Sequence, residues 1–159
     1  MYQHILLAVD GSATSDLALR EATRIAAAGA TIRVVSAVEN PLVTFPLVYG
    51  VAYDIGMVAH AVLEGGRQIL ATAQAEVERQ VGSGVKVEAQ LLDLSQLGGT
   101  IAEAIQHQAE TWPADLIVIG SHGRSGVRRL LLGSVAEHVL RLSRCPVLLV
   151  RAQEAAVAA

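Results

Sequence analysis

The chain has 159 residues, of which 52% are hydrophobic and 17% charged, and this composition excludes a protein that is disordered throughout. Its net charge of −3 provides no overall positive field to attract nucleic acid. The single cysteine, Cys145, excludes a disulfide framework and a zinc ribbon. The length predicts one domain.

The two ends of the chain carry few signals. The first ten residues hold no basic segment, and their apolar run over residues 5–9 is too short for a signal peptide or a membrane span. We therefore expect a cytoplasmic protein. Residues 1–151 are predicted to form the domain, and residues 152–159 a flexible tail.

Short β-branched runs alternate with longer stretches of helical period. Strands are predicted over residues 5–9, 31–38, 85–91, 116–119 and 147–150. The first helix is expected to run from Ser12 to about Ala28, with Gly29 in the left-handed conformation that often ends a helix. The faces of the next three helices are marked by Val62, Ile69, Ala73, Val77 and Val81, by Ile101, Ile105, Ala109 and Trp112, and by Val135, Val139 and Leu142.

This alternation predicts the fold class. Connections of helix length join parallel strands, so we expect an α/β protein with an open five-stranded parallel sheet and helices on both faces. Residues 85–91 alternate apolar and polar side chains, as an edge strand with one wet face does. Residues 40–56 do not fit the pattern, because they are rich in proline, glycine and aromatic residues. They are either a flap that packs on its own sheet, or a lid over a ligand or a contact for another subunit.

The most informative stretch is GSHGRSGVRRLLLGS, which runs from Gly120 to Ser134. It follows the carboxyl end of the most apolar strand, where open α/β sheets bind ligands. Gly120 and Gly123 remove side chains where the backbone must approach something closely. Gly133 and Ser134 present backbone N–H groups at a helix start, which favours an anion. The stretch therefore predicts a phosphate site.

Three arginines lie within this stretch. Arg124 is the preferred phosphate contact because it lies inside the glycine frame. Arg128 and Arg129 are interpreted as solvated surface or as partners for acidic residues of another chain. His122 either polarises a phosphate or shuttles a proton, or it orients the loop through a backbone hydrogen bond.

Other nucleotide and catalytic sites are excluded by their motifs. The only lysine, Lys86, lies on a predicted strand far from any glycine loop, so there is no Walker loop. The turn after the first strand lacks both the dinucleotide-binding glycines and the PP-loop pattern. No G-x-S-x-G elbow of a hydrolase is present. The histidines show no metal-ligand spacing, and Cys145 is interpreted as a small buried hydrophobe rather than a redox switch.

Gly120, Gly123, Gly133 and Ser134 form the pattern G-x2-G-x9-G-[ST], which resembles the nucleotide-binding signature of the universal stress protein family. The resemblance extends to the Asp10-Gly11-Ser12 turn after the first strand and to the closing CPVLLV. It implies a Rossmann-like fold of the adenine nucleotide alpha hydrolase type, with strand order 3-2-1-4-5. In that order the first turn and the glycine loop face each other across one crevice.

The resemblance also implies the ligands, ATP and Mg²⁺, and the residues that contact them. Asp10, Gly11 and Ser12 would lie by the adenosine and phosphate region, Val38 would line the adenine pocket, and Ile119 and Gly120 would border the base and ribose. The residues that would hold the phosphates are Gly123, Arg124, Gly133, Ser134 and Val135. Val9 and His122 are further candidate residues of the nucleotide site. Asp10 is either the Mg²⁺ ligand or an acceptor for the first amides of the first helix. Ser12 is both a good helix cap and a possible phosphate donor.

These features favour a nucleotide-binding regulatory protein, in which bound ATP orders the glycine loop and changes which partners dock. One alternative is a slow Mg²⁺-dependent ATPase or nucleotidyl-transfer enzyme that uses Asp10-bound Mg²⁺ and Arg124. Another is an assembly module that binds AMP or cAMP weakly. The sequence offers no evident general base or catalytic lysine, which favours binding over fast catalysis.

Residues 147–150 would form an apolar edge strand if they end the sheet. Such an edge invites pairing with a second copy of the same chain. The resemblance likewise implies a homodimer through this strand.

Overall fold

The structure is a computed structural model that describes residues 2–39, 55–123 and 132–152. Its strands are β1 (Tyr2–Ala8), β2 (Ala26–Val38), β3 (Lys86–Asp93), β4 (Leu116–Gly120) and β5 (Val147–Val150). Its helices are α1 (Ala13–Ile25), α3 (Ile55–Gln80), α4 (Leu94–Leu97), α5 (Ile101–Thr111) and α6 (Ser134–Leu142).

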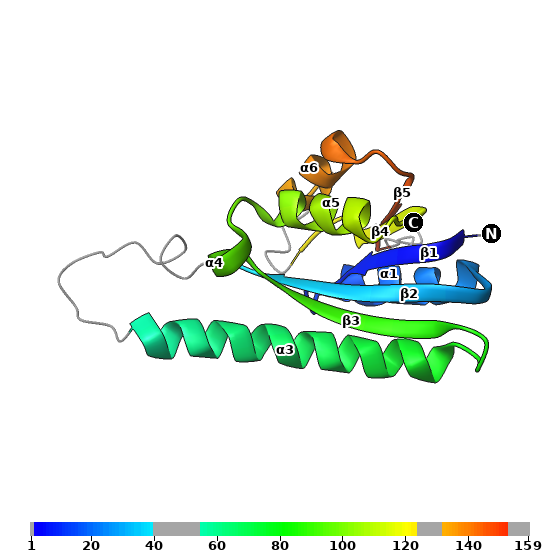
Figure 1. The fold of residues 1–159 in the computed structure, drawn as a ribbon, viewed down its shortest axis with the longest axis horizontal. Coiled ribbons are helices and arrows are strands. Elements are labelled where there is room, and N and C mark those ends of the chain that lie inside the picture. The colour runs from blue at the N-terminus through cyan, green and yellow to red at the C-terminus, as the bar shows by residue number, and fades with distance from the viewer. Residues whose placement is uncertain (1, 40–54, 124–131, 153–159) are drawn as a thin grey trace, which may run out of the picture.

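The strands form one sheet in the order β3-β2-β1-β4-β5, and every neighbouring pair is parallel. Helices α5 and α6 cover one face of the sheet, and α1 and α3 cover the other (Figure 1). The predicted fold class and strand order are therefore confirmed. Because β1 and β4 are adjacent although a hundred residues separate them, the turns that follow them meet at the same edge of the sheet.

The core consists of two apolar layers that share β1. Ile5 and Leu7 point toward α1 and α3, whereas Leu6 and Ala8 point toward α5 and α6. All four are buried, which explains why this strand is apolar without alternation. The central strands are thus fixed from both faces, and they hold the turns at their carboxyl ends in place.

The expected end of the first helix is wrong. Helix α1 ends at Ile25, and β2 begins at Ala26, five residues before the predicted strand. Gly29 does have a left-handed φ of 80°, but it lies within β2, where the pairing with β1 changes register. Its N–H donates to Gly84 O at 2.7 Å. Gly29 therefore accommodates an irregularity within the strand and does not end a helix.

Three smaller expectations also need correction. The short helix α4 gave no sequence signal that we recognised. Leu142, expected on the buried face of α6, has 43% of its surface exposed. Helix α3 already begins at Ile55, so the last two residues of segment 40–56 are helical. The rest of that segment and residues 153–159 lie outside the described residues.

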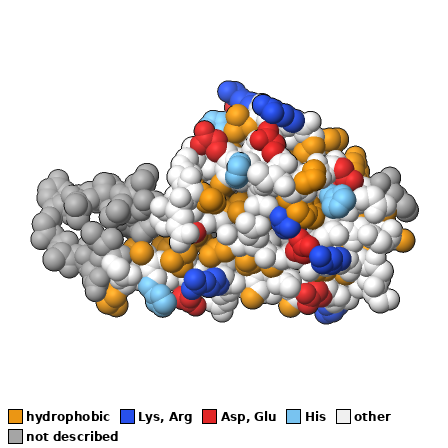
Figure 2. All heavy atoms as spheres, viewed as in Figure 1, with side chains coloured by type: hydrophobic (Ala, Val, Ile, Leu, Met, Phe, Trp, Pro, Cys, Tyr) orange, Lys and Arg blue, Asp and Glu red, His pale blue; other side chains and the backbone are white. Residues whose placement is uncertain are grey.

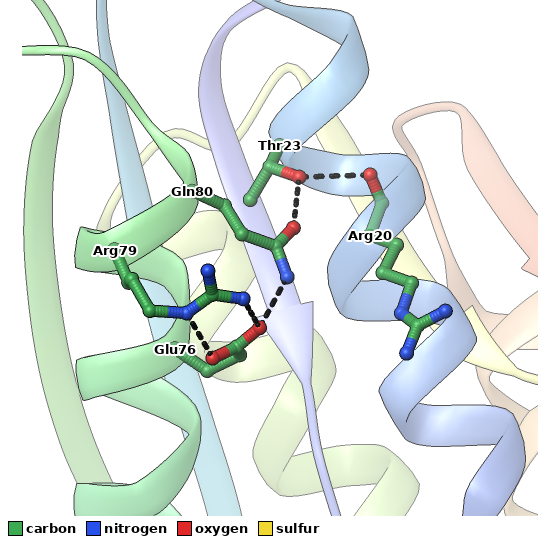
Figure 3. A network of polar contacts seen from close by, with 5 residues as sticks. All are labelled: Arg20, Thr23, Glu76, Arg79 and Gln80. Carbon is green, nitrogen blue, oxygen red and sulfur yellow. Dashed lines mark hydrogen bonds and ion pairs between the residues drawn. The ribbon is translucent and has the colours of Figure 1, made fainter.

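A polar network joins the carboxyl-terminal ends of α1 and α3 (Figure 3). The Thr23 hydroxyl on α1 contacts Gln80 Oε1 on α3 at 3.0 Å, and Gln80 Nε2 donates to Glu76 at 2.6 Å. Glu76 also accepts two hydrogen bonds from the Arg79 guanidinium. The bonds from Arg79 and then Gln80 lower the pKa of Glu76 from 4.5 to about 2. The two helices are therefore tied by side chains at one end.

Charges of both signs are interspersed on the face shown in Figure 2. Glu88 on the edge strand β3 pairs with Lys86 at 2.7 Å and with Arg33 at 2.6 Å. The hydrogen bonds from Lys86 and Arg33 lower the pKa of Glu88. The Arg33 guanidinium also lies 4.5 Å from the centre of the Trp112 ring. The only lysine is thus at the amino end of β3, away from the edge where the turns after β1 and β4 meet.

Helix α3 approaches β2 closely at Gly66. A Cβ added at Gly66 would lie 2.3 Å from Val38 Cγ1 and 3.1 Å from Leu91 Cδ1. A Cβ added at the neighbouring Gly65 would meet nothing within 4 Å.

We expect Gly66→Ala to lower the free energy of unfolding by about 1–3 kcal/mol because the added methyl group overpacks the contact with Val38. The matched variant Gly65→Ala should raise it by about 0.5–1 kcal/mol through the lower entropy of the unfolded chain. Urea denaturation measures both. Equal stabilisation by the two variants would contradict the close approach of α3 to β2.

Candidate functional site

A cavity of about 160 Å³ opens at the carboxyl edge of the sheet. Its hydrophobic lining comes from β1, β2, β4 and α5, and its polar lining comes from the turns after β1 and β4 and from the start of α6. The hydrophobic residues include Ala8, Val35, Ala37, Ile101, Ile105 and Ile119. The polar part consists of Asp10, Gly120, Ser121, His122, Gly123, Gly133 and Ser134. The cavity therefore has an apolar region beside β2 and a polar region above β1 and β4.

The turn after β1 is held by its own side chains. The Asp10 carboxylate accepts the Ser12 N–H at 2.9 Å, and Ser12 Oγ accepts the Ser15 N–H at 3.2 Å. Ser12 is therefore the N-cap of α1, as one of its two interpretations predicted. Asp10 takes up one of the amide groups at this helix start, so its expected structural role is present.

Side-chain hydroxyl groups connect this turn directly to the turn after β4. Thr14 Oγ1 donates to the His122 carbonyl oxygen, and Ser12 Oγ contacts the same oxygen at 3.4 Å. A Cβ added at Gly123 would lie only 2.9 Å from Asp10 Oδ2. Asp10 and Gly123, which are 113 positions apart, are thus neighbours across the cavity.

The glycines after β4 allow close contacts within the protein. A Cβ added at Gly120 would lie 2.8 Å from Thr14 Oγ1 and 3.0 Å from Ser15 N, so α1 can rest on β4 only if this residue is glycine. A Cβ added at Gly133 would lie 3.1 Å from Ser121 O. Neither glycine has a left-handed backbone. Gly120 and Gly133 are required because neighbouring atoms leave no room for a side chain, and not because the backbone needs a left-handed conformation.

Helix α6 begins at the cavity. Gly133 is its N-cap, and no side chain among the described residues caps it. The Gly133 N–H donates to Ser121 O at 2.8 Å, so it is not available to a ligand, contrary to our expectation. The first hydrogen bond within the helix is from Glu137 N to Gly133 O. The N–H groups of Ser134, Val135 and Ala136 therefore form the positive end of the helix dipole beside the polar region.

Ser121 and His122 form a small buried pair in the polar region. Ser121 is completely buried, and its hydroxyl lies 2.8 Å from His122 Nδ1. The other ring nitrogen, His122 Nε2, is buried and has no hydrogen-bond partner among the residues that the structure describes.

The α5 and β2 residues that line the cavity are absent from the contacts predicted from the sequence. Ile101 and Ile105 were interpreted as core positions of a helix, but both also line the cavity. The register of β2 could have identified Val35 and Ala37, because alternate residues of a strand face the same side. These four side chains make up much of the apolar region.

Several predicted contacts do not line the cavity. Val38 packs on the opposite side of β2, where its side chain meets α3 at Gly66, and Ala37 lines the cavity in its place. Gly11, with a φ of 77°, contacts Ile69 of α3. Arg124, Arg128 and Arg129 lie outside the described residues. The structure does bring together nine of the predicted residues at the cavity: Val9, Asp10, Ile119, Gly120, His122, Gly123, Gly133, Ser134 and Val135.

A second hollow lies on the other face of the sheet, between α1 and α3. Its floor includes Leu19, Ile69 and Ala73, and charged groups of α1 and α3 lie along its rim. Val9 and Ser15 contribute to this groove and to the cavity described above.

Within residues 2–39, 55–123 and 132–152, no three histidine, cysteine, aspartate or glutamate side chains are grouped so that they could hold a metal ion by themselves. No helix in the described part of the chain is long and apolar enough to cross a membrane.

Comparison with known proteins identifies relatives along the whole domain. Residues 1–151 match the universal stress protein family. Universal stress protein MJ0531 of Methanocaldococcus jannaschii is 33% identical over 153 residues, which cover 95% of this chain and 83% of that protein. Universal stress protein YxiE of Bacillus subtilis is 33% identical over 156 residues, which cover 95% of this chain and all of that protein.

Solved structures of similar proteins have the same fold. The hypothetical protein MJ0577 superposes with a TM-score of 0.80 at 25% identity, covering 98% of this chain and 99% of that chain. A universal stress protein in complex with cAMP superposes with a TM-score of 0.62 at 25% identity, covering 94% and 97%. The extent of the family match and the identity to its members lead to one conclusion: the chain belongs to the universal stress protein family.

Proposed function

We propose that this chain binds ATP in the cavity at the carboxyl edge of β1 and β4, together with Mg²⁺, and that it acts as a nucleotide-dependent regulatory protein. The observation that carries the proposal is the meeting of two turns, in which Asp10 and Gly123 lie side by side near the start of α6, which no described side chain caps. This arrangement offers backbone donors and a helix dipole to an anion without a lysine.

The lining of the cavity supports a ligand with one apolar and one anionic end. The region formed by Ala37, Ile101 and Ile105 suits a flat base, because such surfaces bury rings well. The polar region at Gly123 and Ser134 suits phosphate oxygens. The phosphates would then lie along the polar region, beside the start of α6.

The glycine at position 123 provides the first test. We expect Gly123→Ala to weaken ATP binding about 10-fold, which corresponds to about 1.4 kcal/mol. The added Cβ would lie 2.9 Å from Asp10 Oδ2 and would displace that carboxylate or the backbone at the polar region. Isothermal titration calorimetry with ATP measures the change in Kd.

Gly82→Ala is the matched control, because nothing lies within 4 Å of a Cβ at that exposed position. Its Kd should equal that of the unmodified protein. Failure of the unmodified protein to bind any adenine nucleotide, in titration or in mass spectrometry of molecules released on denaturation, would reject the proposal.

The donors around Asp10 fit Mg²⁺ that is shared with phosphates. Asp10 supplies carboxylate oxygens and Ser134 a nearby hydroxyl, which are the hard ligands that this ion prefers. Because the described residues contain no complete protein metal site, the cation would need phosphate oxygens and water as further ligands. When bound, Mg²⁺ would neutralise charge on the phosphates.

We expect Asp10→Asn to remove most of the effect of Mg²⁺ on ATP affinity. Asparagine keeps an acceptor for the Ser12 N–H but loses the charge that the ion requires. The loss should be at least about 10-fold, since even groups behind a metal ligand contribute that much. Titrations of both proteins with and without Mg²⁺ measure it, and an unchanged Mg²⁺ effect in the variant would exclude Asp10 as ligand.

The same samples distinguish a binding protein from a slow ATPase. For a protein that acts through its bound state, phosphate release should stay at the background rate in both the unmodified chain and the variant. A measurable rate that Asp10→Asn abolishes would favour the enzyme instead.

A cyclic or monophosphate nucleotide is the second candidate ligand. The observation in its favour is the solved universal stress protein in complex with cAMP, which resembles this chain over 94% of its length. Titration with AMP and cAMP beside ATP ranks the ligands. Tighter binding of AMP or cAMP than of ATP would favour that nucleotide as the ligand.

We also propose a homodimer through β5. This strand is at the edge of the sheet, and each of its residues is only partly buried. Pro146 O and Val150 O accept hydrogen bonds from the chain at β4, so the intervening Val147 and Leu149 direct their N–H groups to the open edge. An apolar edge with free backbone groups favours pairing with a second copy.

We expect Leu149→Pro to convert the dimer into a monomer of 16.7 kDa, because proline removes one outward N–H without affecting the bonds to β4. Light scattering coupled to size-exclusion chromatography measures the mass, and circular dichroism checks that the variant is folded. A folded variant that stays dimeric would contradict pairing along β5.

A further inference from the structure

We propose that an ion cluster formed by Lys86, Glu88 and Arg33, called the edge cluster below, prevents the edge strand β3 from pairing with another chain. This inference rests on the proposed homodimer and explains why assembly would stop there. A chain whose two sheet edges both paired with copies would form an open fibre instead of a closed pair.

The backbone of β3 offers more to a second chain than that of β5. The two strands are the opposite edges of the five-stranded sheet, and β3 has eight residues where β5 has four (Figure 1). Residues 86–93 pair with residues 31–38 of β2 along the inner side of β3. In the described part of the chain, no strand pairs with its outer side. The backbone argument for β5 would therefore predict pairing at β3 as well.

The side chains of the two edges differ. Residues 147–150 are Val-Leu-Leu-Val and carry no charge, so pairing along β5 removes no ion from water. Lys86 and Glu88 are two positions apart on β3 and therefore lie on the same face of the sheet. Lys86 Nζ is 2.7 Å from Glu88 Oε1, and the lysine side chain is 70% exposed. A hydrated charge thus lies where the side chains of an added strand would pack.

The carboxylate of the edge cluster is held from the interior side of the sheet. Arg33 is the β2 residue in register with Glu88, and its guanidinium donates to Glu88 Oε2 at 2.6 Å and 3.0 Å. The same guanidinium lies over the ring of Trp112, at the end of α5. The side chains of Arg33 and Glu88 are only 19% and 25% exposed. Glu88 is therefore fixed in place, and it keeps Lys86 beside the strand.

A strand added to β3 would have to remove water from the edge cluster. Neighbouring strands lie about 4.8 Å apart, so the added side chains would cover Lys86 and Glu88. These two charges already have partners, so the added strand would cost them hydration without giving them a new ion pair. A second copy would also bring its own cluster of two cations and one anion, and the like net charges would repel each other.

The test removes two charges of the edge cluster without adding large apolar side chains. The change Lys86→Thr/Glu88→Gln leaves the net charge at −3, and glutamine keeps an oxygen acceptor for Arg33. Leu149→Pro is added to close β5, so that any association has to use another surface. We expect light scattering to give twice the monomer mass of 16.7 kDa for this triple variant, and 16.7 kDa for Leu149→Pro alone.

The matched control makes the same kinds of change away from any strand edge. Glu64 and Arg67 form an exposed ion pair on α3, with 2.5 Å between Oε1 and Nη1. The change Glu64→Gln/Arg67→Thr, combined with Leu149→Pro, also leaves the net charge at −3 and should give a monomer. Circular dichroism checks that each variant is folded. If the double change at β3 unfolds the chain, Lys86→Thr alone replaces it, because that variant keeps the pair of Arg33 and Glu88.

Hydrogen exchange locates the new contact. The amides on the outer side of β3 should exchange rapidly in Leu149→Pro, because they face solvent. In the triple variant they should become protected at the concentrations at which the mass doubles.

The outcomes separate this inference from the proposed homodimer. A folded triple variant that stays at 16.7 kDa overturns the inference, and so does association without protection of β3. Equal association of the control variant overturns it as well. If the unmodified protein is already a monomer, the dimer through β5 is wrong, and Lys86→Thr/Glu88→Gln without Leu149→Pro then tests β3 by the same measurements.

Discussion

The site depends on one interaction, the acceptance of the Thr14 hydroxyl proton by the carbonyl oxygen of His122. It connects the start of α1 to the turn after β4, with Ser12 near the same oxygen. The parallel pairing of β1 with β4 brings the turns to one edge of the sheet, and this bond fixes their separation. Gly120 leaves room for this contact, because a Cβ there would lie 2.8 Å from Thr14 Oγ1.

The polar region of the cavity contains few charged side chains among the described residues. Among the described residues that line the cavity, Asp10 is the one aspartate, glutamate, lysine or arginine, so the proposed anion would be attracted there by oriented backbone groups. Such groups need no desolvation of a long flexible side chain, and they are aligned before a ligand arrives. The chain uses its single lysine elsewhere, in the ion pair with Glu88 at the edge strand.

The sequence predicted the sheet well, because hydrophobic runs such as residues 116–119 cannot be placed except between two helical layers. It predicted the glycine frame for the right reason at Gly123, which approaches Asp10 closely. It misplaced the end of α1, because Gly29 suits a bulge in a strand as well as a helix terminus. It missed Ala37 because the side of a strand that a residue faces depends on register, which is set by contacts distant in sequence.

The turn after β1, from Val9 to Ser15, separates the cavity from the groove on the opposite face of the sheet. Val9 and Ser15 belong to both surfaces, so neither hollow has a wall of its own at that place. Protein interiors are closely packed, so a small displacement of α1 would change the shapes of both hollows. The two concave surfaces therefore share part of their walls, although they face opposite directions.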